Sequence, residues 1–198
     1  MLFLRVQHCK RCNTQILSET YTSLLDEILK GCRKRQRASQ KRLYEMFYAY
    51  GMSITLYYAN SRNEAAEILN DGFMKVFRNI KSFDDSKPFK PWFRRILINT
   101  AIDHYHKHKK HKQAEHFELY ENQFSSGEKI LSGIAYKEII AMIQQLSPAY
   151  RTVFNLCVVE GYKHKEVAKM LDISVGTSKS NLHKAKQNLQ AMLEKNLT

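Results

Sequence analysis

Apolar residues recur along most of the chain at intervals of three and four positions, which is the period of one face of an α-helix. This pattern predicts helices over residues 24–32, about 38–58 and 62–79. A fourth helix is expected from Pro91, because proline suits a first helical turn in which no amide hydrogen is needed. Gly72 lies inside the third predicted helix, where it costs about 1 kcal/mol relative to alanine. Helix propensity does not explain this glycine.

The C-terminal part of the chain shows two sharply marked breaks in the helical pattern. Ser147 and Pro148 suit the cap and the first position of a helix, and Gly161 has the backbone freedom that ends it. A short second helix follows, and Ser174 can cap a third that extends to about Leu193. Two short helices, a tight turn and a longer helix form a helix-turn-helix unit.

Between these two helical parts, the chain loses its helical period and gains a Ser-Ser-Gly run that is typical of a mobile linker. With only seven glycines and three prolines, the sequence predicts an all-α protein of two small helical domains joined by a flexible linker. The first residues lack a clear helical period, which fits either a disordered extension or a translation start that has been assigned too early. The predicted extension, four-helix domain, linker and helix-turn-helix domain span residues 1–20, 21–112, 113–134 and 135–198.

The charge balance points to an anionic partner. There are 32 lysines and arginines against 19 acidic residues, a net charge of +13. Such a charge is typical of nucleic-acid binding, although ribosomal and membrane-surface proteins share it. No apolar run reaches the roughly 20 residues that cross a bilayer, and the N-terminus loses its apolar character too early for a signal peptide. We therefore expect a cytoplasmic protein.

The possible metal ligands in the sequence do not form a familiar site. Cys9 and Cys12 form a CxxC pair, but no second pair follows at zinc-ribbon spacing, so we expect free thiols in a reducing cytoplasm. A histidine cluster at the end of the fourth helix alternates with lysines, which would repel a cation. The cluster consists of His104, His106, His108 and His111. We interpret it as a basic, DNA-facing segment and expect no metal and no cofactor.

No pattern in the chain indicates catalysis. There is no glycine-rich loop that would cradle a phosphate and no pair of carboxylates in an apolar setting. The protein is therefore not expected to be an enzyme. The rival hypothesis, a histidine-metal nuclease, predicts metal-dependent DNA cleavage by the purified chain alone.

The helix-turn-helix resembles region 4 of bacterial RNA polymerase sigma factors, and it is most similar to the extracytoplasmic-function (ECF) subfamily. The segments that carry this resemblance are Leu146-Ser147-Pro148, Glu160-Gly161-Tyr162, Glu166-Val167-Ala168 and Ile173-Ser174-Val175-Gly176-Thr177-Ser178-Lys179-Ser180. The output domain of response regulators shares the same motif, so a second match is needed.

The N-terminal half supplies that match, because it is similar to sigma region 2. The matching segments occur in the family's order: Leu43-Tyr44-Glu45, residues 64–77, Pro91-Trp92-Phe93-Arg94-Arg95-Ile96 and Asn99-Thr100-Ala101-Ile102-Asp103. A response regulator has no reason to carry the last two segments. The resemblance implies a sigma factor that binds core RNA polymerase and directs promoter-specific transcription initiation. The alternative is a helix-turn-helix regulator that acts without core polymerase.

The resemblance also implies residue roles and partners. Residues expected to bind core polymerase are Glu64, Glu67, Asn70 and Asp71. Residues expected to melt and read the −10 element are Arg95, Asn99, Thr100, Asp103 and Tyr105. Residues expected to read the −35 element are Thr177, Ser178, Lys179, Asn181 and Lys184. The implied partners are core RNA polymerase, promoter DNA and an anti-sigma factor, with no small-molecule substrate.

Three positions depart from the family pattern. Family members often carry valine at the position of Ser178 and arginine at that of Asn181. Asparagine favours adenine where arginine favours guanine, so the −35 sequence cannot be copied from relatives. Lys163 stands where a capping serine is usual, which predicts a less well satisfied helix start.

Overall fold

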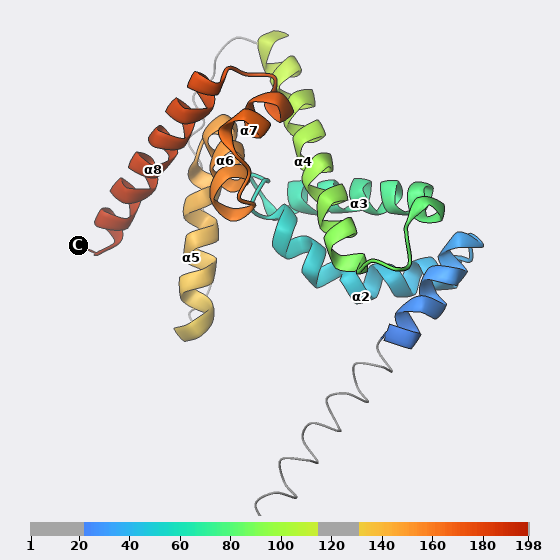
Figure 1. Ribbon diagram of the computed structural model, residues 1–198. Helices are drawn as coiled ribbons and strands as arrows, with labels where there is room; N and C mark the ends of the chain where they lie inside the picture. The colour runs from blue at the N-terminus through green and yellow to red at the C-terminus, as the bar shows by residue number, and fades with distance from the viewer. Residues whose placement is uncertain (1–21, 115–130, 198) are drawn as a thin grey trace, which may run out of the picture. The chain divides into compact units, whose positions relative to one another are not determined.

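The computed structural model describes residues 22–114 and 131–197, and the side chains of residues 22–108 and 137–195 (Figure 1). All regular structure in these residues is helical, which confirms the predicted fold class. The expected extension over residues 1–20 lies outside the described part, as do Cys9 and Cys12. The two described cysteines, Cys32 and Cys157, are free thiols.

The helices follow the predicted order closely. A helix over residues 22–33 comes first. The elements that follow are α2 (Arg37–Thr55), α3 (Arg62–Asn79), the 3-10 turn η1 (Ile80–Ser82), α4 (Phe89–Ala114), α5 (Leu131–Gln145), α6 (Pro148–Phe154), the π-helical turn η2 (Asn155–Val159), α7 (His164–Leu171) and α8 (Val175–Leu197). Of the predicted linker, residues 113–114 belong to α4 and residues 131–134 to α5, while residues 115–130 lie outside the described part.

The described residues form two compact units. The first contains residues 22–49 together with Phe73–Phe93, and the second contains Tyr50–Gly72 together with the described residues from Arg94 onwards. Helices α2, α3 and α4 therefore each contribute to both units.

Aromatic side chains form the centre of the first unit. The ring centroids of Phe47 and Phe89 lie 4.8 Å apart, and those of Phe73 and Phe93 lie 4.9 Å apart. Such pairs contribute about 0.5–1.5 kcal/mol each beyond their burial. Trp92 is half-buried and packs against the same cluster through Phe83 and Phe89.

In the second unit, Gly72 allows α3 and α4 to approach closely. A Cβ atom at this position would lie 2.4 Å from Cδ2 of Leu97, which is fully buried on α4. That contact is shorter than carbon atoms tolerate, so any larger residue would displace Leu97. Packing against α4 therefore explains the glycine that helix propensity leaves unexplained.

We expect Gly72→Ala to destabilise the protein by about 1–3 kcal/mol, because overpacking the helix contact outweighs the gain in helix propensity. Truncation of Leu97 to alanine should cost less in the Gly72→Ala background than in the wild type, since the new methyl group fills part of the space. A double-mutant cycle by chemical denaturation measures this coupling. Gly176→Ala is the control, because its Cβ would meet no atom closer than 3.5 Å. Additive effects at positions 72 and 97 would contradict the packing explanation.

Local capping defines the helices of the C-terminal part. The hydroxyl oxygen of Ser147 accepts a hydrogen bond from the Tyr150 amide, and Pro148 takes the first position of α6. Gly161 has a φ of +76°, a conformation that glycine adopts without strain. Asp172, with a φ of 50°, makes the turn between α7 and α8 that Figure 1 shows. These features confirm the predicted helix-turn-helix.

Candidate nucleic-acid interface

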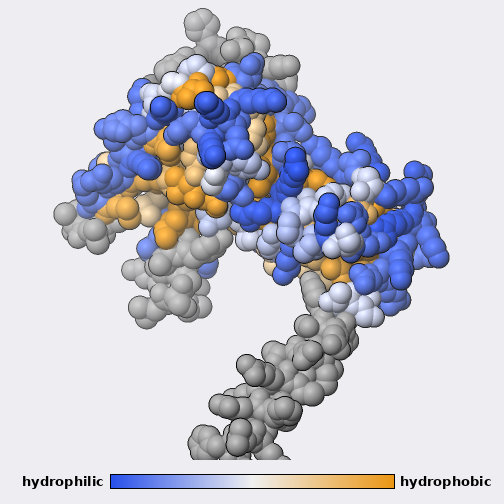
Figure 2. Space-filling model, in the orientation of Figure 1, coloured by the Kyte–Doolittle hydropathy of each residue, from blue (hydrophilic) through white to orange (hydrophobic). Residues whose placement is uncertain are grey.

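The N-terminal half of α8 presents most of the residues that were predicted to read DNA. Thr177, Lys179 and Lys184 are exposed, and Asn181 is half-exposed. Ser174 caps the helix, since its hydroxyl oxygen accepts a hydrogen bond of 2.9 Å from the Thr177 amide. Hydrophilic side chains cover much of α8 on the face that Figure 2 shows, and apolar side chains gather beside it toward α5.

Ser178 behaves differently from its neighbours on α8. Its side chain is completely buried, and its hydroxyl forms a 2.9 Å hydrogen bond with Nδ1 of His164 on α7. Sγ of Cys157 lies 3.8 Å from the same nitrogen. Ser178 therefore holds α7 against α8, and we leave it out of the residues that touch DNA. His164 was not singled out in the sequence, where nothing distinguishes it from the other surface histidines.

The start of α7 is better satisfied than Lys163 suggested. The Lys163 side chain makes no capping hydrogen bond. Its backbone amide instead donates to Oε2 of Glu166 at 2.7 Å, which is the reciprocal half of a capping box.

A second polar surface follows α4. Arg95, Asn99 and Asp103 are exposed and lie four residues apart, so they share one face of the helix. Tyr105 is half-buried, and burial raises the pKa of its hydroxyl above the usual value. Thr100 is buried, and its hydroxyl donates to the carbonyl of Ile96 at 2.7 Å. It therefore faces the interior and is also left out of the proposed DNA contacts.

The predicted polymerase-binding residues lie on α3. Glu67, Asn70 and Asp71 are exposed, whereas Glu64 is half-buried and already accepts a hydrogen bond. Oε2 of Glu64 accepts a hydrogen bond of 2.6 Å from the Asn60 amide, so this carboxylate holds the segment that precedes the helix. The exposed face is therefore formed by the other three residues.

Within the second unit, buried polar groups link the C-terminal helices to α4 and to the segment before α3. Arg94 donates two hydrogen bonds to Glu160, of 2.8 and 2.6 Å, and the Glu160 side chain is only 8% exposed. The amide nitrogen of the Asn155 side chain donates to the carbonyl of Tyr57. A ring nitrogen of His106 lies 3.0 Å from the carbonyl of Met170.

Arg151 extends this network. Its guanidinium donates to Oδ1 of Asn60 at 2.5 Å and to the carbonyl of Gln144 at 2.9 Å, and the side chain is almost fully buried. Burial lowers the pKa of Arg151 to about 10, against the opposing effect of the Glu64 carboxylate. The group stays charged at neutral pH. The roles of Arg151 and Glu160 could not be recognised from the sequence, because nothing in their spacing indicates a partner.

Both helical parts match one protein family. Sigma-70 region 2 matches residues 43–111, and Sigma-70, region 4 matches residues 136–189. The two matches occur in the order that sequence analysis predicted. The chain therefore belongs to the sigma-70 family of RNA polymerase sigma factors.

Curated relatives place it in the ECF subfamily. It is 29% identical over 142 residues to the ECF RNA polymerase sigma factor SigW of Bacillus subtilis, covering 66% of this chain and 76% of the relative. It is 28% identical over 158 residues to SigM of the same organism, covering 76% and 92%. As an ECF sigma factor, the protein binds core RNA polymerase and directs promoter-specific initiation, while the polymerase performs the catalysis.

Solved structures of similar proteins include two sigma factors in complexes. CnrH, solved with the cytosolic domain of CnrY, is 17% identical with a TM-score of 0.43, covering 85% of this chain and 96% of that one. RpoE of Bartonella quintana, solved with the anti-sigma factor NepR, is 18% identical with a TM-score of 0.46, covering 78% and 96%. Within the described residues of the present chain, no helix combines the length and the apolar character that crossing a membrane requires.

Proposed function

We propose that this sigma factor reads its promoter with two separate helical faces. The exposed residues of α8, namely Thr177, Lys179, Asn181 and Lys184, contact the −35 element in the major groove. The side-chain amide of Asn181 suits the adenine edge, which offers one donor and one acceptor. The lysines bind phosphates, so affinity falls steeply as salt rises.

The α4 face reads the −10 element. The observation that carries this proposal is the exposed row of Arg95, Asn99 and Asp103 along one side of the helix. Asn99 makes paired hydrogen bonds to an unstacked base, and Arg95 binds a neighbouring phosphate. Tyr105 lies six residues beyond Asn99 and off this row, and it offers an aromatic ring on which a base stacks, a contact worth about 1–3 kcal/mol.

The exposed face of α3 binds the core enzyme. Glu67 and Asp71 lie four residues apart and carry negative charge in a chain whose net charge is +13, so they form a local acidic surface. Such a surface suits a basic face on the polymerase. Asn70 lies between them and adds a polar group.

We also propose a cytoplasmic location and control by an anti-sigma factor. Both follow from the subfamily: a sigma factor acts where core polymerase is, and ECF factors are commonly held inactive by such a partner. RpoE of Bartonella quintana was solved with an anti-sigma factor.

Run-off transcription with purified core polymerase tests the promoter assignment, using the DNA upstream of the gene for this chain as template. We expect a discrete transcript that appears only when both the core enzyme and this protein are present. A scrambled −35 segment in the same template is the control and should reduce the product. Tight binding to the duplex without core polymerase, with no transcript, would instead favour the helix-turn-helix regulator.

A further inference from the structure

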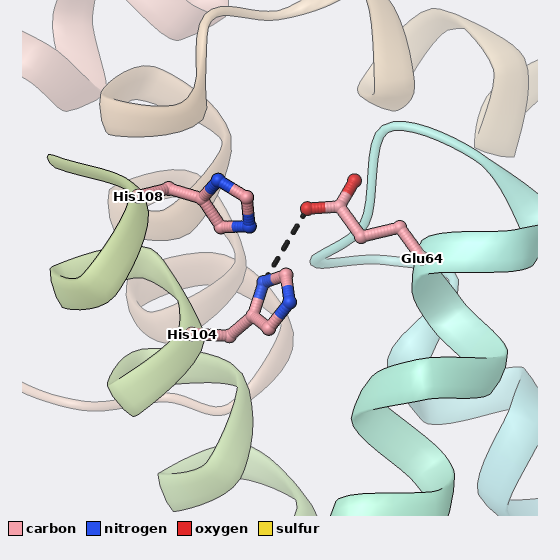
Figure 3. Close-up of side chains that lie close together, drawn as sticks. All are labelled: Glu64, His104 and His108. Atoms are coloured by element: carbon pink, nitrogen blue, oxygen red, sulfur yellow. Dashed lines mark ion pairs between the residues drawn. The ribbon is translucent and has the colours of Figure 1, made fainter. Parts of the chain in front are cut away.

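Three possible metal ligands from two helices meet in the second unit. Glu64 lies near the start of α3, and His104 and His108 lie one turn apart on α4. One ligand atom from each residue lies within 4.8 Å of the other two. Figure 3 shows the three side chains pointing toward one another, with an ion pair between Glu64 and His104. The ring centroids of the two histidines are 4.4 Å apart.

Hydrogen bonds and burial hold two of these ligands in place. Oε2 of Glu64 accepts from the Asn60 amide, which leaves Oε1 facing Nδ1 of His104 at 3.4 Å. The side chains of Glu64 and His104 are only 18% and 15% exposed. His108 is exposed, so a cation can enter from its side. Ligands that are already oriented lose little freedom when they bind a metal.

The charges around the cluster favour a cation. The carboxylates of Glu64, Glu67 and Asp71 all lie close enough to His104 to interact with its charge. They place negative charge beside the histidine pair.

Positive groups act against metal binding. They include the lysines that alternate with the histidines, such as Lys107 beside His108, and Arg151. Arg151 is close enough for the Glu64 carboxylate to raise its pKa. Its guanidinium is directed to Asn60 and the carbonyl of Gln144, and neither contact involves the ligand atoms.

We propose that Glu64, His104 and His108 form a zinc site that ties the start of α3 to the C-terminal half of α4. Two imidazoles and a carboxylate are the donors that catalytic and accessible zinc sites use, with nitrogen and oxygen at about 2.0–2.2 Å from the metal. Water takes the remaining position. Ligand atoms around a tetrahedral zinc ion lie roughly 3.4 Å from one another, so the three side chains have to draw closer than their present spread of up to 4.8 Å when the metal binds. This proposal differs from the expectation of no metal, which treated the four histidines as one run and did not include Glu64.

Zinc titration of the full chain against a chromophoric competitor tests the site. The titration uses a Cys9→Ser/Cys12→Ser background, so that the thiol pair takes up no metal. We expect one zinc per chain and an affinity at least about tenfold weaker in His108→Gln and in Glu64→Gln. Both variants should fold, because His108 is exposed and the amide oxygen of glutamine can still accept the hydrogen bond that Glu64 receives from the Asn60 amide. His183→Gln, which changes an exposed histidine of α8, should bind zinc like the background chain.

Two further measurements locate the metal. Zinc at about 100 times its dissociation constant should raise the unfolding temperature by roughly 5–10 °C, and this shift should disappear in His108→Gln. In NMR spectra of the imidazole nitrogens, zinc should shift His104 and His108 but not His183. Absence of stoichiometric zinc, or zinc affinity that Glu64→Gln leaves unchanged, would overturn the proposal. These results do not depend on transcription and leave the promoter assignment separate.

Discussion

Replacement of Asn99 with alanine is expected to lower transcription from the cognate promoter by roughly 5- to 150-fold without changing the unfolding temperature. Asn99 is exposed on α4, so its removal opens no cavity in the core. A paired hydrogen bond to a base edge contributes about 1–3 kcal/mol of discrimination, which corresponds to this range of rates. Run-off transcription with core polymerase measures the loss, and a thermal melt checks the fold.

Asn188→Ala is the control, because Asn188 is also an exposed asparagine on a long helix and lies one turn beyond Lys184, the last residue of α8 that we propose to contact DNA. It should transcribe like the wild type. Asn99→Ala should also retain its affinity for core polymerase, since the residues proposed for that contact lie on α3. Transcription within twofold of wild type in Asn99→Ala would remove the −10 assignment from this residue.

Arg94→Met is expected to destabilise the protein by about 3 kcal/mol. The substitution leaves the Glu160 carboxylate without its two charged hydrogen bonds in a position that is only 8% exposed. Loss of one partner of a buried ion pair costs about 3–5 kcal/mol, and the lower end applies because the Arg94 side chain is 34% exposed and partly screened by solvent. Chemical denaturation of the full chain measures the change in the free energy of unfolding.

The Arg33–Asp85 pair provides a control of equal geometry and different burial. Its shortest distance is also 2.6 Å, but the Asp85 side chain is 57% exposed. Arg33→Met should therefore cost about 1 kcal/mol or less. Equal costs for the two variants would mean that Glu160 is not shielded from solvent, and the link between α4 and the C-terminal helices would then be in doubt.

The positions of the helices followed from local signals that the sequence contains. The predicted third helix matches α3 at both ends, and Ser147 and Pro148 mark the start of α6 as expected. Apolar period, caps and glycine breaks act within a few residues, so they can be recognised without knowledge of the fold. The start of α4 at Phe89, two residues before Pro91, shows the usual uncertainty of helix ends.

The sequence predicted the candidate site less completely. A family motif is a continuous stretch of sequence, whereas neighbouring residues of a helix point in different directions and some of them are buried. Asn99 is exposed and the next residue, Thr100, is buried. Ser178 is buried between two exposed neighbours. A closer count of the helical period would have found both: Thr100 lies three residues after Leu97, and Ser178 lies four before Leu182 and seven before Ala185.

Sequence alone was sufficient for the all-α class and for the two sigma-like regions, because the first follows from helical spacing and the second from motifs that run along the chain. Only the tertiary structure showed why Gly72 is required, that Arg94 pairs with Glu160, and that Glu64 meets His104 and His108. Each of these contacts joins residues at least 25 positions apart. Distant partners leave no periodic signal in a single sequence, so the packing of helices decides which side chains meet.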